Sequence, residues 1–318
     1  MNVKILNSLK HSFGLLLGAA LILPLHAAEK PFNIVGLTVG DLGNPFFIQI
    51  RDGAESKVKE LNEGAKFNAQ SSGYDINKQT NQIDDFISFG TDLILLGAAD
   101  SKGIAPAVKK AKAAGITVVA VDVGAEGGVD ATVMSDNRQA GQLAAKYIVD
   151  RLKGQGQIVI LNGPPVTSIQ DRVAGALEVF KQSPGIKILS QDQNTGSTRD
   201  GGLRIMTDLL TANPKIDAVF TINDESGIGA DLAAKQAQRN EFFIVGVDGS
   251  PDAVQALKKK DSLFVATAAQ DPYAMAQRAV EVAADIMSGK KPATDPVLVP
   301  VTLVTRDTVK DYKGWTTK

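Results

Sequence analysis

Residues 34–47 read IVGLTVGDLGNPFF, and this stretch predicts the unit from which the chain is built. Residues 34–38 form a short β-branched and apolar run, which is typical of a buried strand. The turn after it leads to Pro45, a residue favoured at the first position of a helix, and residues 46–60 have the apolar spacing of a helix. A strand, a turn and a helix in this order predict a βα unit.

The same alternation continues through both halves of the chain. Further strands are predicted at 66–71, 93–96, 118–121, 132–134, 157–161, 186–191, 218–221 and 243–247, and further helices at 78–89, 104–114, 169–182, 200–211 and 227–238. A chain of this length commonly exceeds one hydrophobic core. The pattern therefore predicts two successive α/β domains of similar design, with ligands held outside the carboxyl ends of parallel strands.

The first 28 residues have the pattern of a signal peptide. Lys4 and Lys10 supply the positive start, residues 13–23 the apolar core, and residues 24–28 a small-residue exit with cleavage predicted after Ala27 or Ala28. The alternative is a membrane anchor, but an apolar run of about a dozen residues is short of the roughly 20 that span a bilayer. We therefore expect a soluble exported protein.

Charge and composition exclude several classes of function. Without Lys4 and Lys10, 32 of the 34 basic residues remain against 35 acidic residues, and this balance lacks the basic surface that nucleic-acid binding requires. Both histidines, His11 and His26, fall in the predicted signal peptide, and the chain has no cysteine. The mature chain therefore has no disulfides, no histidine-based triad, no thiolate nucleophile and no histidine or cysteine metal site.

The turn after the first predicted strand carries a polar residue beside two aromatic ones. Asn44 can both donate and accept hydrogen bonds, and the face of Phe46 or Phe47 can pack on the C–H surface of a sugar ring. Alternatively, Asn44 only caps the helix and one phenylalanine belongs to the core. Since adjacent helical residues point about 100° apart, at least one of the two rings is expected to face the cleft.

Three other strand ends carry polar residues. Asp122 follows the strand at 118–121, Asn223 and Asp224 follow the strand at 218–221, and Asp248 follows the strand at 243–247. Each alone is commonly a turn or cap residue, but together they favour a polar cleft for a ligand rich in hydroxyl groups. Arg172, on the helix after the Pro164-Pro165 turn, could hold two adjacent oxygens or could be an exposed helical arginine.

Seven groups of short motifs lie in order along residues 44–272. They are Asn44-Pro45-Phe46-Phe47, Asp84-Asp85-Phe86-Ile87 ahead of Gly90-Thr91-Asp92, Ala114-Gly115-Ile116 before Asp122, Ser135-Asp136-Asn137, Asn223-Asp224, Gly246-Val247-Asp248-Gly249 and Gln270-Asp271-Pro272. With these motifs the chain resembles the ribose-binding-protein family, the type I periplasmic sugar-binding proteins of ABC importers. The resemblance covers nearly the whole mature chain.

The resemblance implies an α/β fold of two Rossmann-like three-layer domains joined by a three-segment hinge, with crossings near Ser135, Gln270 and Pro300. The N-terminal sugar-binding domain would comprise residues 31–135 plus 271–300, and the C-terminal one residues 136–270 plus 301–318. It further implies a monomeric periplasmic protein that captures a pentose, a hexose or a related polyol between the domains. Its partner would be an inner-membrane ABC permease.

The resemblance also implies which residues bind the ligand. They are Asn44, Phe46, Phe47, Asp122, Ser135, Arg172, Asn223, Asp248 and Gln270. Three positions depart from ribose-binding relatives, because Gly97 replaces an asparagine, Val123 an arginine and Ser197 an aromatic residue. A less basic, roomier pocket is expected, and ribose, another pentose, a deoxy sugar, a hexose or a polyol could fill it. The Asp-x-Asn-x-Asp-Gly calcium loop of glucose and galactose relatives is missing, so neither a metal nor another cofactor is expected.

Three other classes of protein share parts of this pattern. A sugar-responsive repressor would need a DNA-binding helix-turn-helix where the predicted signal peptide stands. A glycosidase could use Asp122 and Asp248 as its acid pair, but Arg172 nearby is expected to hold a carboxylate ionised rather than to raise its pKa. A receptor component for chemotaxis or quorum sensing would use the same fold, and the sequence does not separate it from a transporter component.

Overall fold

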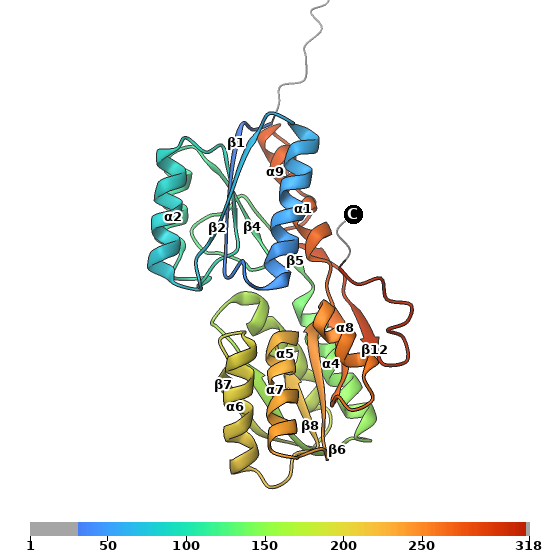
Figure 1. Cartoon of the computed structure of the whole chain (residues 1–318). Coiled ribbons are helices and arrows are strands. Elements are labelled where there is room, and N and C mark those ends of the chain that lie inside the picture. Colours follow the sequence, from blue (N-terminus) through green and yellow to red (C-terminus); the bar gives the residue numbers. More distant parts are fainter. Residues whose placement is uncertain (1–30, 316–318) are drawn as a thin grey trace, which may run out of the picture.

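The structure, a computed structural model, describes residues 31–315, which form two α/β lobes (Figure 1). The first lobe contains β1 (Ile34–Val39), α1 (Pro45–Leu61), β2 (Lys66–Ser71), α2 (Ile76–Ser88), β3 (Leu93–Leu96), α3 (Ala105–Ala113), β4 (Thr117–Val121), β5 (Ala131–Ser135), α9 (Pro272–Met287) and β11 (Val297–Val299). The second lobe contains α4 (Asn137–Arg151), β6 (Gln155–Asn162), α5 (Thr167–Lys181), β7 (Gly185–Asn194), α6 (Arg199–Ala212), β8 (Ala218–Thr221), α7 (Asp224–Gln236), β9 (Phe243–Asp248), α8 (Pro251–Lys258), β10 (Phe264–Ala269) and β12 (Thr302–Thr305).

Both lobes are built around a six-stranded sheet with the same strand order. The first sheet runs β11-β5-β4-β3-β1-β2 and the second β12-β10-β9-β8-β6-β7. Neighbouring strands are parallel except for β10 and β12, which are antiparallel. Helices cover both faces of each sheet, since α1 packs with α9 while α2 packs with α3, and α4 packs with α5 while α6 packs with α7. The predicted fold class is confirmed.

The burial of each strand explains its composition. All residues of the central strands β3 and β9 are buried, and they read as apolar runs because helices cover both faces. The edge strands β2 and β7 are only partly buried and carry lysine, asparagine and glutamine. Polar side chains on an edge discourage pairing with another chain. The apolar core therefore lies between each sheet and its helices.

Between β1 and β12 the chain passes from one lobe to the other three times. It leaves the first lobe after β5 to form α4, returns after β10 to form α9, and leaves again between β11 and β12. On one side the lobes touch, because Val123 of the first and Val166 and Ile169 of the second belong to one hydrophobic cluster.

Side chains cap the N-termini of helices at the ends that face the other lobe. Asn44 accepts a hydrogen bond from the Phe46 N–H at the start of α1, and Asn223 accepts one from the Ser226 N–H at the start of α7. Because of the second cap, α7 begins three residues before the helix predicted at 227–238. Asp75 likewise caps α2, which begins two residues before its predicted start.

Among residues 31–315, no helix is both long enough and apolar enough to cross a membrane. The predicted signal peptide, residues 1–28, lies outside the described residues.

Candidate ligand-binding site

A cavity with about 500 Å³ of empty space lies between the lobes. Its lining comes from strand ends and the first turns of helices in both lobes. The first lobe supplies Gly40, Asn44, Phe46, Phe47, Tyr74, Gly97, Ala98, Asp122 and Val123, and the second supplies Val166, Ser168, Ile169, Arg172, Ser197, Asn223 and Asp248. Both lobes therefore contribute to one cavity, part of which is open to solvent.

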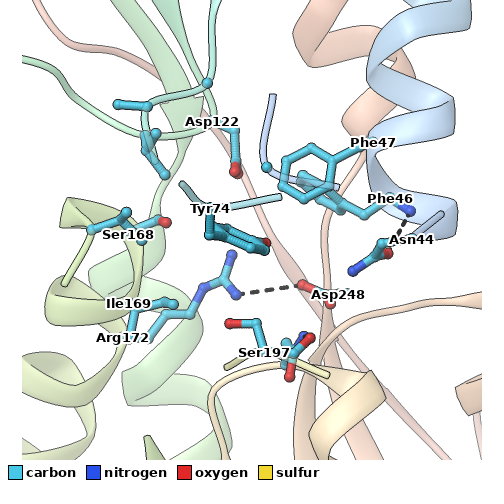
Figure 2. A pocket seen from close by; sticks show the side chains of 16 residues that line it. Asn44, Phe46, Phe47, Tyr74, Asp122, Ser168, Ile169, Arg172, Ser197 and Asp248 are labelled. Atoms are coloured by element: carbon cyan, nitrogen blue, oxygen red, sulfur yellow. Dashed lines mark hydrogen bonds and ion pairs between the residues drawn. The ribbon is translucent and has the colours of Figure 1, made fainter. Parts of the chain in front are cut away.

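Three rings of the first lobe form the aromatic wall of the cavity. Phe46 and Phe47 meet edge to face with their centroids 5.4 Å apart, and Phe47 meets Tyr74 in the same way at 6.2 Å. Both phenylalanines line the cavity and also belong to the first-lobe core, with 5% and 7% of their surface exposed. An apolar face is therefore held rigidly against the cavity, and Figure 2 shows Phe46, Phe47 and Tyr74 around it.

Asn44 both caps a helix and lines the cavity, the two roles that the sequence left open. Its Oδ1 accepts the hydrogen bond from the Phe46 N–H at 2.9 Å, which caps α1, and the residue also lines the cavity. In the part of the chain that the structure describes, the side-chain nitrogen Nδ2 of Asn44 makes no hydrogen bond, so its two N–H groups are available to a ligand.

Asp122 carries a buried oxygen without a partner. The residue follows β4, is 6% exposed and has a φ of 71°, and within residues 31–315 its Oδ1 has no hydrogen-bond partner. Burial raises the pKa of Asp122 to about 6, against a smaller opposing effect of the Arg172 guanidinium. Figure 2 shows the Asp122 side chain at the cavity, where its carboxylate is a strong acceptor for a ligand donor.

Arg172 is a buried positive charge held from three sides. Its Nε donates to Asn137 Oδ1 at 2.8 Å, and its Nη1 donates to Ile222 O at 2.7 Å and to Asp248 Oδ1 at 3.4 Å. Its Nη2 forms no hydrogen bond within the described residues. The Asn137 side chain is itself fixed by the Ser135 carbonyl oxygen, 3.0 Å away. The guanidinium is therefore oriented by protein atoms, and Nη2 remains as a donor at the cavity.

Asp248 lies opposite Asp122, at the carboxyl end of β9. Its Oδ1 also accepts a hydrogen bond of 2.7 Å from Gln270 Nε2. Burial raises the pKa of Asp248, although Arg172 acts in the opposite direction. The expectation that Arg172 keeps these carboxylates ionised without a rise in pKa is thus wrong. The loss of hydration raises the pKa of Asp122 and Asp248 more than the Arg172 guanidinium lowers it. This guanidinium also donates to a carbonyl oxygen and to an amide oxygen.

Behind Asp248 lies a second carboxylate that does not line the cavity. Asp224 is fully buried and accepts hydrogen bonds from the Ser250 N–H at 2.7 Å and the Thr267 hydroxyl at 2.8 Å. Burial, followed by the neighbouring Asp248 charge, raises the pKa of Asp224. Asn223, beside it, lines the cavity while its side chain donates to Ser197 O and caps α7.

The cavity brings together seven of the nine residues implied by the resemblance, and two lie outside its lining. Ser135 is buried at the end of β5, and within the described residues its hydroxyl has no hydrogen-bond partner. Gln270 meets the cavity only through Asp248. Gly97, Val123 and Ser197, at which the resemblance implies a departure from ribose-binding relatives, all line the cavity.

Reasoning from the sequence missed several lining residues, and Tyr74 is the most informative. It follows β2, with a φ of 60° between Gly73 and the helix cap Asp75. The rule used for the other strands, that a residue after a strand end faces the ligand, would have found it. Tyr74 also explains Gly40, because a Cβ at Gly40 would lie 2.6 Å from the Tyr74 ring.

The polar atoms that line the cavity are oxygen and nitrogen atoms, and the described residues do not arrange them as a set of metal ligands. Within residues 31–315 no group of three or more histidine, cysteine, aspartate or glutamate side chains could hold a metal ion. Two carboxylates, one guanidinium, amides and an aromatic wall between two lobes define a protein that encloses a small polar molecule.

Comparisons with known proteins give the family. The chain matches the periplasmic binding protein domain over residues 35–291. It is 35% identical to the ribose import binding protein RbsB of Bacillus subtilis over 84% of this chain and 86% of that protein. It is 32% identical to the xylitol-binding protein of Mycolicibacterium smegmatis over 89% of this chain and 80% of that protein.

A solved structure agrees with these relatives. An ABC transporter solute binding protein from Mycobacterium smegmatis with bound glycerol has a TM-score of 0.82 and 29% sequence identity, covering 89% of this chain and 98% of that one. The chain belongs to the periplasmic binding protein family, whose members are solute-binding proteins, and the predicted resemblance to ribose-binding proteins is confirmed.

Proposed function

We propose that this protein captures a monosaccharide or a polyol between its lobes in the periplasm and delivers it to the inner-membrane permease of an ABC importer. The observation that carries the proposal is the buried Oδ1 of Asp122, which has no hydrogen-bond partner within residues 31–315, on a residue that lines a cavity with an aromatic wall. Similarity to the ribose and xylitol binding proteins supports the same class of ligand.

The unpaired groups of the cavity match hydroxyls. A buried polar atom without a partner costs about 1 to 3 kcal/mol, and more when it is charged, so a ligand that supplies a donor to Asp122 regains that energy. Asn44 and Arg172 offer the complementary donors. Only a ligand with donors and acceptors on neighbouring atoms satisfies all three, and a hydroxyl provides both on one oxygen.

The nine residues implied by the resemblance divide into seven proposed direct contacts and two residues that act through a neighbour. Direct contact with the ligand is assigned to Asn44, Phe46, Phe47, Asp122, Arg172, Asn223 and Asp248. Gln270 acts through the Asp248 carboxylate, to which it donates at 2.7 Å. Ser135 acts through its carbonyl oxygen, which orients Asn137 and, through Asn137, the Arg172 guanidinium.

Three positions of the cavity lining extend the proposed ligands beyond ribose. Gly97 and Ser197 both line the cavity, and by resemblance they stand where ribose-binding relatives carry larger side chains. Val123 stands where the resemblance implies an arginine, so Arg172 is the one arginine among the described residues of the lining. We therefore propose that another pentose, a deoxy sugar, a hexose or a polyol is as suitable a ligand as ribose.

Capture requires the lobes to open and close. The N-terminal domain is proposed to comprise residues 31–135 plus 271–300, and the C-terminal domain residues 136–270 plus 301–318, so that the three crossings form the hinge. The monomer would then become more compact when a ligand fills the cavity. Small-angle scattering with saturating ligand should show a smaller radius of gyration.

The proposal includes binding without chemical change. Residues 29–318 contain neither histidine nor cysteine, which removes the commonest nucleophile and base pairs. The raised pKa values of Asp122 and Asp248 would suit an acid catalyst, so recovery of the ligand is a required test. NMR of the bound and released ligand should show the starting compound alone.

The deciding experiment is a thermal-shift screen of the mature protein over pentoses, hexoses and alditols, followed by calorimetry. A ligand present at about 100 times its dissociation constant stabilises the folded state by about 2.7 kcal/mol, which is a measurable rise in melting temperature. A single site filled by a sugar or polyol is expected. Binding of only charged or aromatic compounds, or conversion of the ligand, would overturn the proposal.

A further inference from the structure

The last described residues cross between the lobes a fourth time. After β12, Val309 and Tyr312 pack in the core of the second lobe, whereas Trp315 packs against the core of the first. Gly314 has a φ of 71°, a left-handed conformation that glycine adopts without strain, and it turns the chain between these contacts. The segment 313–315 therefore bridges the lobes beside the three crossings.

Trp315 continues the aromatic wall of the cavity. Its ring meets Phe46 edge to face at 5.7 Å and 69°, just as Phe46 meets Phe47 and Phe47 meets Tyr74. Four rings thus form one series that begins outside the cavity at Trp315 and ends inside it. Trp315 does not line the cavity, so its influence on a ligand passes through the Phe46 ring.

The indole of Trp315 also connects to the opposite wall. Its Nε1–H donates to the Gln270 carbonyl oxygen at 3.1 Å. Gln270 in turn holds Asp248 twice, with its backbone N–H on the Asp248 carbonyl oxygen at 2.9 Å and its Nε2 on Oδ1 at 2.7 Å. The Trp315 side chain is therefore in contact with Phe46 in the first lobe and with Gln270, which holds Asp248, in the second.

We propose that Trp315 is a positioning residue of the ligand-binding cleft, which sets the Phe46 ring and, through Gln270, the Asp248 carboxylate at the separation that a ligand needs. The inference rests on the proposed function, because its effect is an affinity for a sugar or polyol. A wall held in place before binding loses less conformational freedom when the ligand arrives, so the tether favours the bound state.

The affinity test uses the full mature chain and either D-ribose or xylitol, whichever the unchanged protein binds more tightly. Trp315→Ala should weaken binding about ten-fold, since it removes one ring contact and one hydrogen bond, and mainly through faster dissociation. Trp315→Phe keeps a ring against Phe46 and should regain most of the loss.

The matched control is another hydrogen bond of the same segment. Tyr312→Phe removes the bond from the Tyr312 hydroxyl to Gly249 O, 3.1 Å long, without touching Phe46 or Gln270. Its affinity should stay within about two-fold of the unchanged protein. Wild-type binding by Trp315→Ala, or an equal loss in Tyr312→Phe, would overturn the inference.

A second measurement needs no ligand and separates this inference from the proposed function. Urea unfolding, followed by circular dichroism, is compared for Trp315→Ala, Phe46→Leu and the double variant. Coupled rings should make the effect of Trp315→Ala on the unfolding equilibrium about two- to ten-fold smaller when Phe46 is already replaced. Additive effects would overturn the inference by themselves. If neither sugar nor polyol binds, the proposed function fails and this coupling alone decides the role of Trp315.

Discussion

Asp122 and Asp248 occupy equivalent positions in the two lobes. Asp122 directly follows β4 and Asp248 ends β9, and these strands have the same place in their sheets. Both residues have positive φ angles, 71° and 131°, which are uncommon outside glycine. Such strain costs on the order of 1 to 3 kcal/mol per residue and persists where the surrounding structure enforces it. The two lobes thus present matched carboxylates to one cavity.

Loss of either carboxylate should weaken binding severely. We expect Asp122→Asn and Asp248→Asn each to lower affinity about ten- to a thousand-fold, because a desolvated ligand hydroxyl loses its charged acceptor. Asparagine tolerates positive φ, so the backbone is retained. Calorimetry should include Asp208→Asn, an exposed change on α6, as the control. If only Asp122→Asn matters, the ligand sits on the first lobe alone and closure is not part of binding.

The same Asp122→Asn change should stabilise the ligand-free protein, and more so at high pH. Burial raises the pKa of Asp122 to about 6, so the folded protein holds its proton more tightly than the unfolded chain, whose aspartates have a pKa of about 4. The stability from this proton is fully present below about pH 4 and is lost as pH rises through 6. Ionised Asp122 then costs the fold on the order of 3 kcal/mol.

Urea unfolding at two pH values checks this sign. The gain in unfolding free energy from Asp122→Asn should be larger by about 1 to 2 kcal/mol at pH 8 than at pH 5. A gain that is equal at both values would mean that the carboxylate is already compensated in the ligand-free cavity.

The aromatic wall should contribute through ring geometry rather than through burial alone. Phe47→Leu keeps an apolar side chain in the core but removes the edge-to-face contacts to Phe46 and Tyr74 and the face toward the ligand. We expect about three- to ten-fold weaker binding by calorimetry. Phe89→Leu makes the same chemical change at a residue that is 67% exposed and should leave affinity unchanged. Equal affinities of both variants would remove the aromatic wall from the site.

Thr167 joins the lobes at the rim of the cavity. Its hydroxyl accepts the Gly124 N–H at 2.7 Å, and its own N–H donates to the Ser101 hydroxyl at 3.1 Å. Thr167→Val removes the first bond with little change in shape and should speed ligand dissociation about three- to ten-fold. Stopped-flow measurement should compare Thr207→Val, because the Thr207 hydroxyl donates to Leu203 O within α6. An unchanged dissociation rate would show that this contact does not hold the closed form.

The sequence alone was enough to predict the fold because its determinants are local. Buried parallel strands such as β3 read as apolar runs, and helices such as α1 begin at a cap followed by proline. Strand ends of parallel sheets gather at one edge, so Asn44, Asp122 and Asp248 could be placed at a cleft before any coordinates were known.

Other features depend on residues far apart in the chain and were decided only by the tertiary structure. Ser168 and Ile169 line the cavity because the second lobe meets the first, and no periodicity encodes that distance. Burial, which no short motif reports, raises the pKa values of Asp122 and Asp248 in spite of Arg172. Trp315 meets Phe46 across most of the chain length, since only the packed lobes bring their segments together.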